Sequence, residues 1–262
     1  MITIETGRAS AAVAVEEGGR LASLVVDGAE LLVTRGADDD PMLWGAYPMV
    51  PYAGRVRDGR FTHDGRTVEL PLSLPPNAGH GLVWNRPWTR TDDGGDATRA
   101  ALAIELGPDW PFGGRVEQQF HLTDDELRCT LTVVASDRSM PAEVGWHPWF
   151  ASRGPIDVRA TAMYERVGNL PTGRLVAPGP PPWDDCFLTT DHISFPVGAL
   201  TVTVRSDCDH VVLFDEMDRG IAVEPQSGPP DAFHLRPRVL APHEHLSRTM
   251  TIAWRTRSHT DR

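Results

Sequence analysis

The chain has 262 residues, with 36 acidic against 25 basic side chains and a formal net charge of -11. This acidic balance, without any cluster of Lys and Arg, excludes the electrostatic footprint of a nucleic-acid-binding protein and favours a small-molecule ligand. The three cysteines, Cys129, Cys186 and Cys208, are odd in number and lack metal-type spacing, so we expect neither disulfides nor a zinc site.

The N-terminus, MITIETGRAS, has no basic start followed by an apolar run, and no segment approaches the roughly 20 apolar residues of a membrane span. We therefore expect a cytoplasmic protein without a membrane partner. No Ser/Gly-rich linker or shift in composition divides the chain, so one domain over residues 1–262 is expected.

Short runs of alternating or β-branched apolar residues recur along the chain. In chain order they predict strands over residues 11–16, 20–26, 100–106, 115–122, 126–135, 200–205, 210–215, 221–224 and 248–254. Turn-forming residues such as His63-Asp64-Gly65 and Thr123-Asp124-Asp125 predict hairpins over 61–70 and 115–135.

Glycine and proline are abundant, at 24 and 23 residues, and helical periodicity is almost absent. The pattern predicts an all-β fold, a large antiparallel β-sandwich with few short helices. The longest loop is expected over residues 169–185, because its proline-rich stretch from Pro178 to Pro182 cannot join a central strand.

Two imidazoles and a carboxylate are the candidate chemical groups. His80 lies in NAGHGLVWNRPW, a loop rich in turn formers, and His147 lies in GWHPWF, where Pro148 favours extended geometry. Glu224 ends an apolar run, so partial burial would suit it to act as a base. Taken singly, each has a plainer interpretation: a solvated loop histidine, a core histidine and an exposed strand-end glutamate. Together they suit a proton shuttle between two oxygens of one substrate.

Flat aromatic side chains accompany these groups in the sequence. They are Trp84, Trp88, Trp146, Trp149 and Phe233. Such rings form apolar platforms for the C–H faces of a sugar, so we expect carbohydrate chemistry. His243 and His245 flank Glu244 without a third ligand, and a solvated edge is a better interpretation than a metal site. Serine-hydrolase and nucleotide motifs are absent from the sequence.

Four segments, HGLVWNRPW, GWHPWF, PWDDCF and VEPQSGPPDAF, resemble in order the motifs of the aldose 1-epimerase (galactose mutarotase) family. The resemblance covers most of the chain and implies a galactose mutarotase-like β-supersandwich without a cofactor. It also implies that Glu224 is the general base and His147 the general acid. His80 would then help to bind the sugar or to protonate its ring oxygen.

The resemblance implies substrate-binding residues as well. Asp184 matches the family's aspartate, although adjacent Asp185 is an alternative, and Arg55 in PMVPYAGRV matches the arginine of an Asn-Arg pair. Trp84, Trp146 and Phe233 are expected to contact the sugar.

Two departures from the family pattern bear on the substrate. Gly54 stands where many members have asparagine, and Trp84 stands where hexose-6-phosphate epimerases carry an arginine. Since tryptophan cannot replace an arginine in bidentate phosphate recognition, the second departure favours a neutral aldose.

Three hypotheses follow. The leading one is a mutarotase of a free aldose. The second is an epimerase of a modified sugar, such as a hexose phosphate or sulfo-sugar, with Arg55, Arg57 and Arg86 as its cations. The third is a non-catalytic sugar-binding β-sandwich, which would not need two histidines matched to a glutamate.

Overall fold

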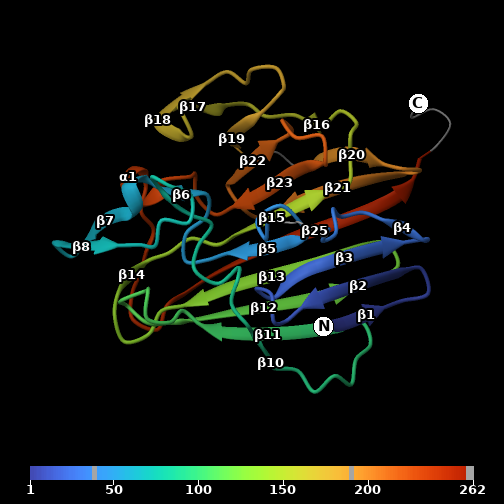
Figure 1. The fold of residues 1–262 in the computed structure, drawn as a ribbon, viewed down its shortest axis with the longest axis horizontal. Helices are drawn as coiled ribbons and strands as arrows, with labels where there is room; N and C mark the ends of the chain where they lie inside the picture. Colours follow the sequence, from blue (N-terminus) through green and yellow to red (C-terminus); the bar gives the residue numbers. More distant parts are fainter. Residues whose placement is uncertain (37–39, 189–191, 258–262) are drawn as a thin grey trace.

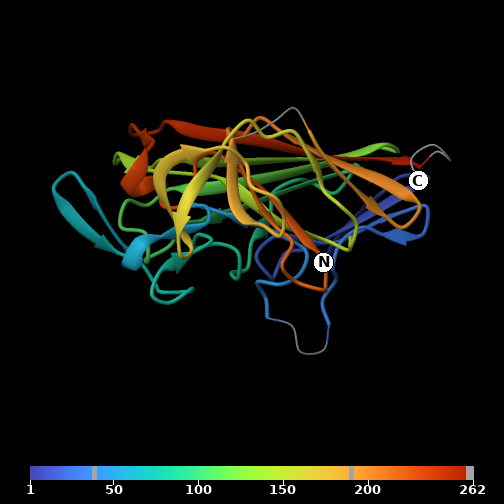
Figure 2. The ribbon, with the colours of Figure 1, turned by 90° about the horizontal axis from the view of Figure 1, so that it is seen from above.

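The structure is a computed structural model that describes residues 1–36, 40–188 and 192–257. Over these residues two large antiparallel sheets stack against each other as layers (Figures 1 and 2). The prediction of an all-β antiparallel sandwich is confirmed. No helix in the described ranges has the length and apolar character needed to cross a bilayer.

The larger sheet has eleven strands across the described residues. In spatial order they are β1 (Ile2–Glu5), β2 (Ala9–Ala14), β3 (Arg20–Val26), β5 (Ala46–Met49), β15 (Gly145–Phe150), β23 (Ile221–Gln226), β22 (His210–Phe214), β19 (Asp184–Leu188), β17 (Met163–Val167) and β18 (Leu170–Val176), with β4 (Ala29–Glu30) beside β3.

The second sheet has eight strands in the same part of the chain. Their spatial order is β10 (Thr89–Arg90), β11 (Arg99–Glu105), β12 (Arg115–Leu122), β13 (Glu126–Val134), β25 (His245–Thr256), β21 (Leu200–Ser206), β20 (Ile193–Val197) and β16 (Asp157–Val158).

Short elements cover one end of the sandwich (Figure 1). Three two-stranded pairs are β6 (Arg55–Val56) with β9 (Ala78–Gly79), β7 (Arg60–His63) with β8 (Arg66–Glu69), and β14 (Met140–Pro141) with β24 (Val239–Leu240). The short helices are η1 (Arg57–Gly59) and α1 (Ala232–Leu235). The β7–β8 hairpin projects from this end (Figure 2).

Burial explains which strands the sequence marks most clearly. Strand β12 is buried at every second residue, so one of its faces packs into the core between the sheets and the other faces outward. Strands β15 and β23 are buried along their whole length. Their outer face must therefore be covered too, and this covered outer face contains the candidate site.

The predicted hairpins over 61–70 and 115–135 are present as β7–β8 and β12–β13. The predicted loop over 169–185 was wrong, because β18 pairs with β17 there and β19 begins at Asp184. Strand β18 is an edge strand with mostly exposed side chains, so it lacks the apolar alternation by which strands are recognised. The proline-rich stretch does lie between strands, after β18.

Candidate active site

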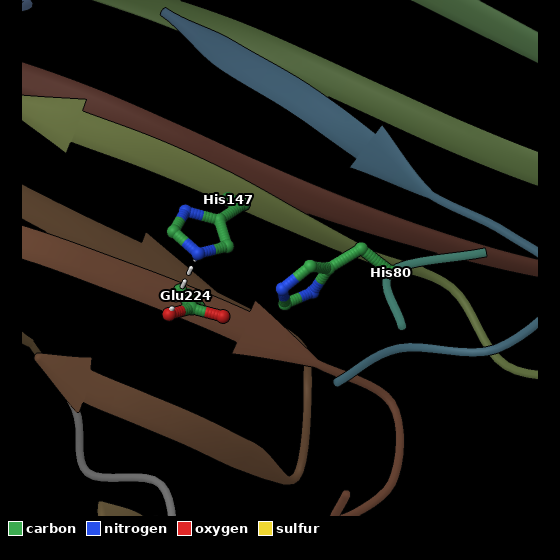
Figure 3. A group of neighbouring side chains, drawn as sticks. All are labelled: His80, His147 and Glu224. Carbon is green, nitrogen blue, oxygen red and sulfur yellow. Dashed lines mark ion pairs between the residues drawn. The ribbon is translucent and has the colours of Figure 1, made fainter. Parts of the chain in front are cut away.

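His147 and Glu224 face each other across two neighbouring central strands. Strand β15 pairs antiparallel with β23 through Gly145 to Gln226 and Trp149 to Ala222, a register that puts His147 opposite Glu224. Side chains opposite each other in an antiparallel pair lie close enough for direct contact. The His147 Nε2 atom accordingly lies 3.2 Å from Glu224 Oε1 (Figure 3).

His80 reaches the same place from a loop that crosses the end of β5. Its backbone N–H donates to the Gly54 carbonyl at 2.7 Å, and its φ of 59° is left-handed. At Gly81 a Cβ would lie 2.2 Å from the Val50 carbonyl oxygen, so only glycine permits this close crossing. A non-glycine residue held at positive φ in a cavity wall is the kind of local strain that clusters at functional sites.

Aromatic packing fixes the two imidazoles. The His147 ring stacks on Tyr47 at a centroid distance of 4.8 Å and on Trp149 at 5.4 Å. The His80 ring meets His147 edge-on at 5.0 Å, and its Nδ1 lies 3.1 Å from Met49 Sδ. The other ring edge of His80 points towards Glu224 (Figure 3).

These groups line a cavity of about 160 Å³ on the outer face of the larger sheet. Sites for drug-sized ligands are larger, about 300–1,000 Å³, so the cavity suits a small ligand. Alternate residues of adjacent strands supply its wall: His147 and Trp149 from β15, Glu224 and Gln226 from β23, Val212 and Phe214 from β22, and Asp184 and Cys186 from β19. This is the side-chain period of a sheet, with one face turned to the ligand.

Burial sets the charge state of the central pair. It raises the pKa of Glu224 well above its usual value, with the Asp184 charge raising it further and Arg55 opposing. Burial also lowers the pKa of His147 well below its usual value, and the neighbouring His80 imidazole lowers it further. Two groups this close titrate as a unit. One proton on the pair keeps its net charge at zero, which is the state that burial favours.

Burial also favours the uncharged form of two flanking groups, His80 and Asp184. Burial lowers the pKa of His80 to about 3, with Arg55 contributing, so this imidazole is neutral at physiological pH. Burial also raises the pKa of Asp184, while Arg166 and Arg55 oppose the shift. Asp185 does not line the cavity, and its Oδ1 accepts a hydrogen bond from Arg166 Nε at 2.8 Å. The geometry therefore favours Asp184 over Asp185 as a ligand-facing carboxyl.

Three aromatic residues expected at the sugar lie elsewhere, and the expectation is corrected. Trp146 alternates with His147 along β15 and so points into the core between the sheets. Trp84 packs behind the site on Tyr47, with ring centroids 5.9 Å apart. Phe233 packs on Phe61 at 4.9 Å. None of the three lines the cavity.

The cavity wall also contains residues that sequence reasoning missed. Tyr164, Arg166, Asn169 and Pro171 enter from the β17–β18 hairpin, and Phe214 enters from β22. Asn169 and Pro171 lie in the segment that the sequence predicts as a loop, and no strand was predicted over residues 163–167, which contain Tyr164 and Arg166. Trp149 had been noticed beside His147, and the period of two along GWHPWF would have marked it as the ring on the same face.

His80, His147 and Glu224 also form the one group in the described part of the chain whose donor atoms are close enough to hold a metal ion. Donor atoms of His80, His147 and Glu224 all lie within 4.8 Å of one another. Two imidazoles and a carboxylate are acceptable transition-metal ligands. The geometry therefore admits two chemistries, metal binding and metal-free proton transfer. His243 and His245 are both exposed and belong to no such group.

The sequence is similar to one protein family and to a protein of Escherichia coli. The family model described as Aldose 1-epimerase matches residues 1–253. The uncharacterized protein YphB of Escherichia coli K12 is 32% identical over 119 residues, which is 44% of this chain and 40% of that protein. The chain thus aligns with less than half of YphB.

Two solved structures are similar over nearly the whole chain. A galactose mutarotase-like protein from Clostridium acetobutylicum has a TM-score of 0.84 at 18% identity, over 97% of this chain and 95% of its own. A galactose 1-epimerase from Lactobacillus acidophilus has a TM-score of 0.80 at 18% identity, over 98% of this chain and 94% of its own. At these identities the likeness concerns the fold alone.

Proposed function

Because this chain belongs to the aldose 1-epimerase family, we propose that it interconverts the α and β anomers of a free aldose by acid–base opening and closure of the sugar ring. The observation that carries the proposal is the contact between His147 and Glu224, 3.2 Å apart in the wall of a small cavity. A buried imidazole and carboxyl facing one space are suited to serve two oxygens of the same ring.

The proposed reaction begins with the anomeric hydroxyl, whose proton Glu224 accepts. His147 donates a proton to the ring oxygen, and the bond between that oxygen and the anomeric carbon breaks to leave an open-chain aldehyde. Rotation about the adjacent carbon–carbon bond presents the other face of the carbonyl. Ring closure returns both protons and yields the opposite anomer.

Burial favours the pair with its one proton on Glu224. Hydrogen bonds from the sugar hydroxyl groups to the carboxylate would favour its charged form, so the reacting state holds the proton on His147 when the sugar is bound. Ring opening converts Glu224 from carboxylate to carboxylic acid and His147 from imidazolium to neutral imidazole, and ring closure reverses both changes. The net charge of the buried pair stays constant, so no net charge has to be created in the cavity. This constancy supports the assignment of His147 and Glu224 as acid and base.

Other residues of the wall are proposed to hold the sugar. Asp184 and Arg55 offer an acceptor and donors for its hydroxyl groups, and His80 offers a neutral imidazole beside the ring oxygen. Trp149 is the aromatic platform for the C–H face, in place of Trp84. A binding module would have no use for an acid matched to a base, so the non-catalytic alternative has less support.

A neutral aldose is expected to be a better substrate than its 6-phosphate. Arg57 is paired with Asp231 and Arg86 donates to the Leu106 carbonyl. Arg55 therefore remains in the cavity, together with Arg166, which Asp185 holds. Bringing a phosphate dianion into such a site costs hydration without a free bidentate partner.

The measurement is kcat/KM for glucose and galactose against glucose-6-phosphate. We expect the neutral sugars to be favoured by at least about tenfold, a difference of roughly 1.4 kcal/mol in transition-state binding. A preference for the phosphate that Arg55→Ala or Arg166→Ala abolishes would instead establish the modified-sugar hypothesis.

Turnover is expected to survive exhaustive chelation, because proton transfer by Glu224 and His147 requires no Lewis acid. The protein is treated with EDTA, its metal content is measured, and mutarotation is compared with the untreated sample. Loss of activity that one divalent ion restores would assign the His80, His147 and Glu224 group to a metal instead.

A further inference from the structure

Two buried carboxyl groups connect two segments that contribute to the cavity wall. The first segment, residues 51–57, carries Gly54 and Arg55, and the second, residues 226–231, carries Gln226 and Pro230. Asp231 is fully buried and Glu143 is 3% exposed. Neither carboxyl belongs to the cavity wall, and neither has a part in the proton transfers.

Asp231 ties the two segments together. Its Oδ1 accepts a hydrogen bond from the Arg57 backbone N–H at 2.9 Å, and its Oδ2 accepts from Arg57 Nε at 3.1 Å and pairs with Nη2 at 3.0 Å. Its own backbone N–H donates to the Arg55 carbonyl at 2.6 Å. His234 Nδ1 adds a contact to Oδ1 at 2.7 Å. One residue therefore holds the backbone on both sides of Val56, immediately after Arg55.

Glu143 fills the space between the same segments. Its backbone N–H donates to the Pro51 carbonyl at 2.7 Å, and its Oε2 accepts from the Ala53 N–H at 3.4 Å. On the other side, a Cβ at Gly228 would lie 1.9 Å from Glu143 Oε1, so the second segment presses against this carboxyl. Burial raises the pKa of Glu143 to about 8, with Asp231 adding to the shift, so the group is uncharged at neutral pH.

The two segments meet at the cavity itself. At Gly54, whose φ is 60°, a Cβ would lie 2.9 Å from Pro230 Cβ. Arg55 follows immediately and is half-buried in the wall. Its guanidinium forms no hydrogen bond or ion pair with another residue in the described ranges, so its position depends on the backbone that carries it. If that backbone were mobile, fixing the long Arg55 side chain on a ligand would cost more conformational entropy.

We propose that Asp231 and Glu143 are positioning residues that fix Arg55 against the sugar, with Arg57 as the outer half of the same clamp. The proposal deepens the proposed function and rests on it for the role of Arg55 in sugar binding. Because a pre-organised binding group acts on substrate and transition state alike, loosening the clamp should raise KM and leave kcat nearly unchanged.

Arg57→Ala is the first test, since the Arg57 side chain is 47% exposed and outside the cavity. The Arg57 backbone N–H and His234 still contact the Asp231 carboxylate in this variant, and thermal unfolding checks that it folds. We expect KM for the preferred aldose to rise roughly tenfold with kcat within about twofold of wild type, because a loosened Arg55 would bind substrate and transition state less well to the same extent. The matched control is Arg60→Ala, which removes an arginine paired with exposed Glu69 and should change neither constant.

A double-mutant cycle separates positioning from a general structural effect. If Arg57 acts through Arg55, the Arg57→Ala substitution should have little further effect on KM in an Arg55→Ala background. Fully additive effects of the two substitutions would overturn the proposal, as would an Arg57→Ala variant indistinguishable from the Arg60→Ala control.

Glu143 is tested by a conservative pair. Glu143→Gln keeps the size and uncharged state of the side chain and should retain wild-type KM, whereas Glu143→Ala should raise it. Equal KM values for wild type and a folded Glu143→Ala variant would remove Glu143 from the clamp.

Hydrogen–deuterium exchange of the peptide covering residues 50–58 gives a readout that needs no turnover. Exchange should be faster in Arg57→Ala than in wild type or Arg60→Ala, and equal exchange in all three contradicts the clamp. This result stands even if no aldose is turned over, so failure of the clamp and failure of the proposed function are distinguishable.

Discussion

Glu224→Gln is expected to fold like the wild type and to lose about 10²–10⁴-fold of its mutarotase rate, the usual loss when a positioned base is removed. The amide has nearly the shape of the carboxyl and remains buried beside Gln226, whose Nε2 lies 3.3 Å from Glu224 Oε2. It cannot accept the anomeric proton. Packing is thus retained while the proposed chemistry is lost.

Polarimetry of freshly dissolved α-glucose or α-galactose measures this loss, with thermal unfolding as the check on the fold. Glu69→Gln is the matched control, because Glu69 is an exposed carboxylate in an ion pair on the projecting hairpin. A folded Glu224→Gln protein that keeps more than about a tenth of wild-type activity would rule out Glu224 as the base, since a tenfold loss is smaller than removal of a base produces.

Substitution of His147 is expected to have the second-largest effect. His147→Ala should lower kcat by about 10²-fold or more, because His147 is the group that lies opposite Glu224 and is proposed to supply the ring-oxygen proton. His80→Ala should reduce turnover less and should also raise KM, since His80 borders the pair without contacting the glutamate in an ion pair.

His147→Gln accompanies the alanine variant, because removing a ring that stacks on Tyr47 and Trp149 also costs packing. His243→Ala is the control, since that histidine is exposed. If both His147 variants fold and turn over sugar at the wild-type rate, the acid must be another group.

Strand periodicity explains how much of the fold was predictable. The predicted strands over 20–26 and 115–122 coincide with β3 and β12, where alternating burial leaves a clear pattern of two. Strand β18 was missed because its edge position leaves most of its side chains exposed, and Pro171 and Gly173 resemble loop residues.

The sequence marked the three central residues of the candidate site but neither its geometry nor most of its wall. Local patterns marked His80, His147 and Glu224, yet the register that sets His147 against Glu224 depends on pairing between segments more than 70 residues apart. Arg166 was missed for a related reason, since its place at the cavity depends on the β17–β18 hairpin. Nearness in sequence also suggested Trp146 as a sugar platform, although alternation turns it away from His147.

Exchange NMR of glucose and galactose at anomeric equilibrium tests the central claim most directly. Exchange peaks are expected between the α and β anomeric protons, without any new product. The exchange rate should rise in proportion to the concentration of wild-type protein and should stay at the uncatalysed value with Glu224→Gln. Folded wild-type protein that leaves the exchange rate of these sugars and of a panel of other hexoses and pentoses unchanged would contradict the claim.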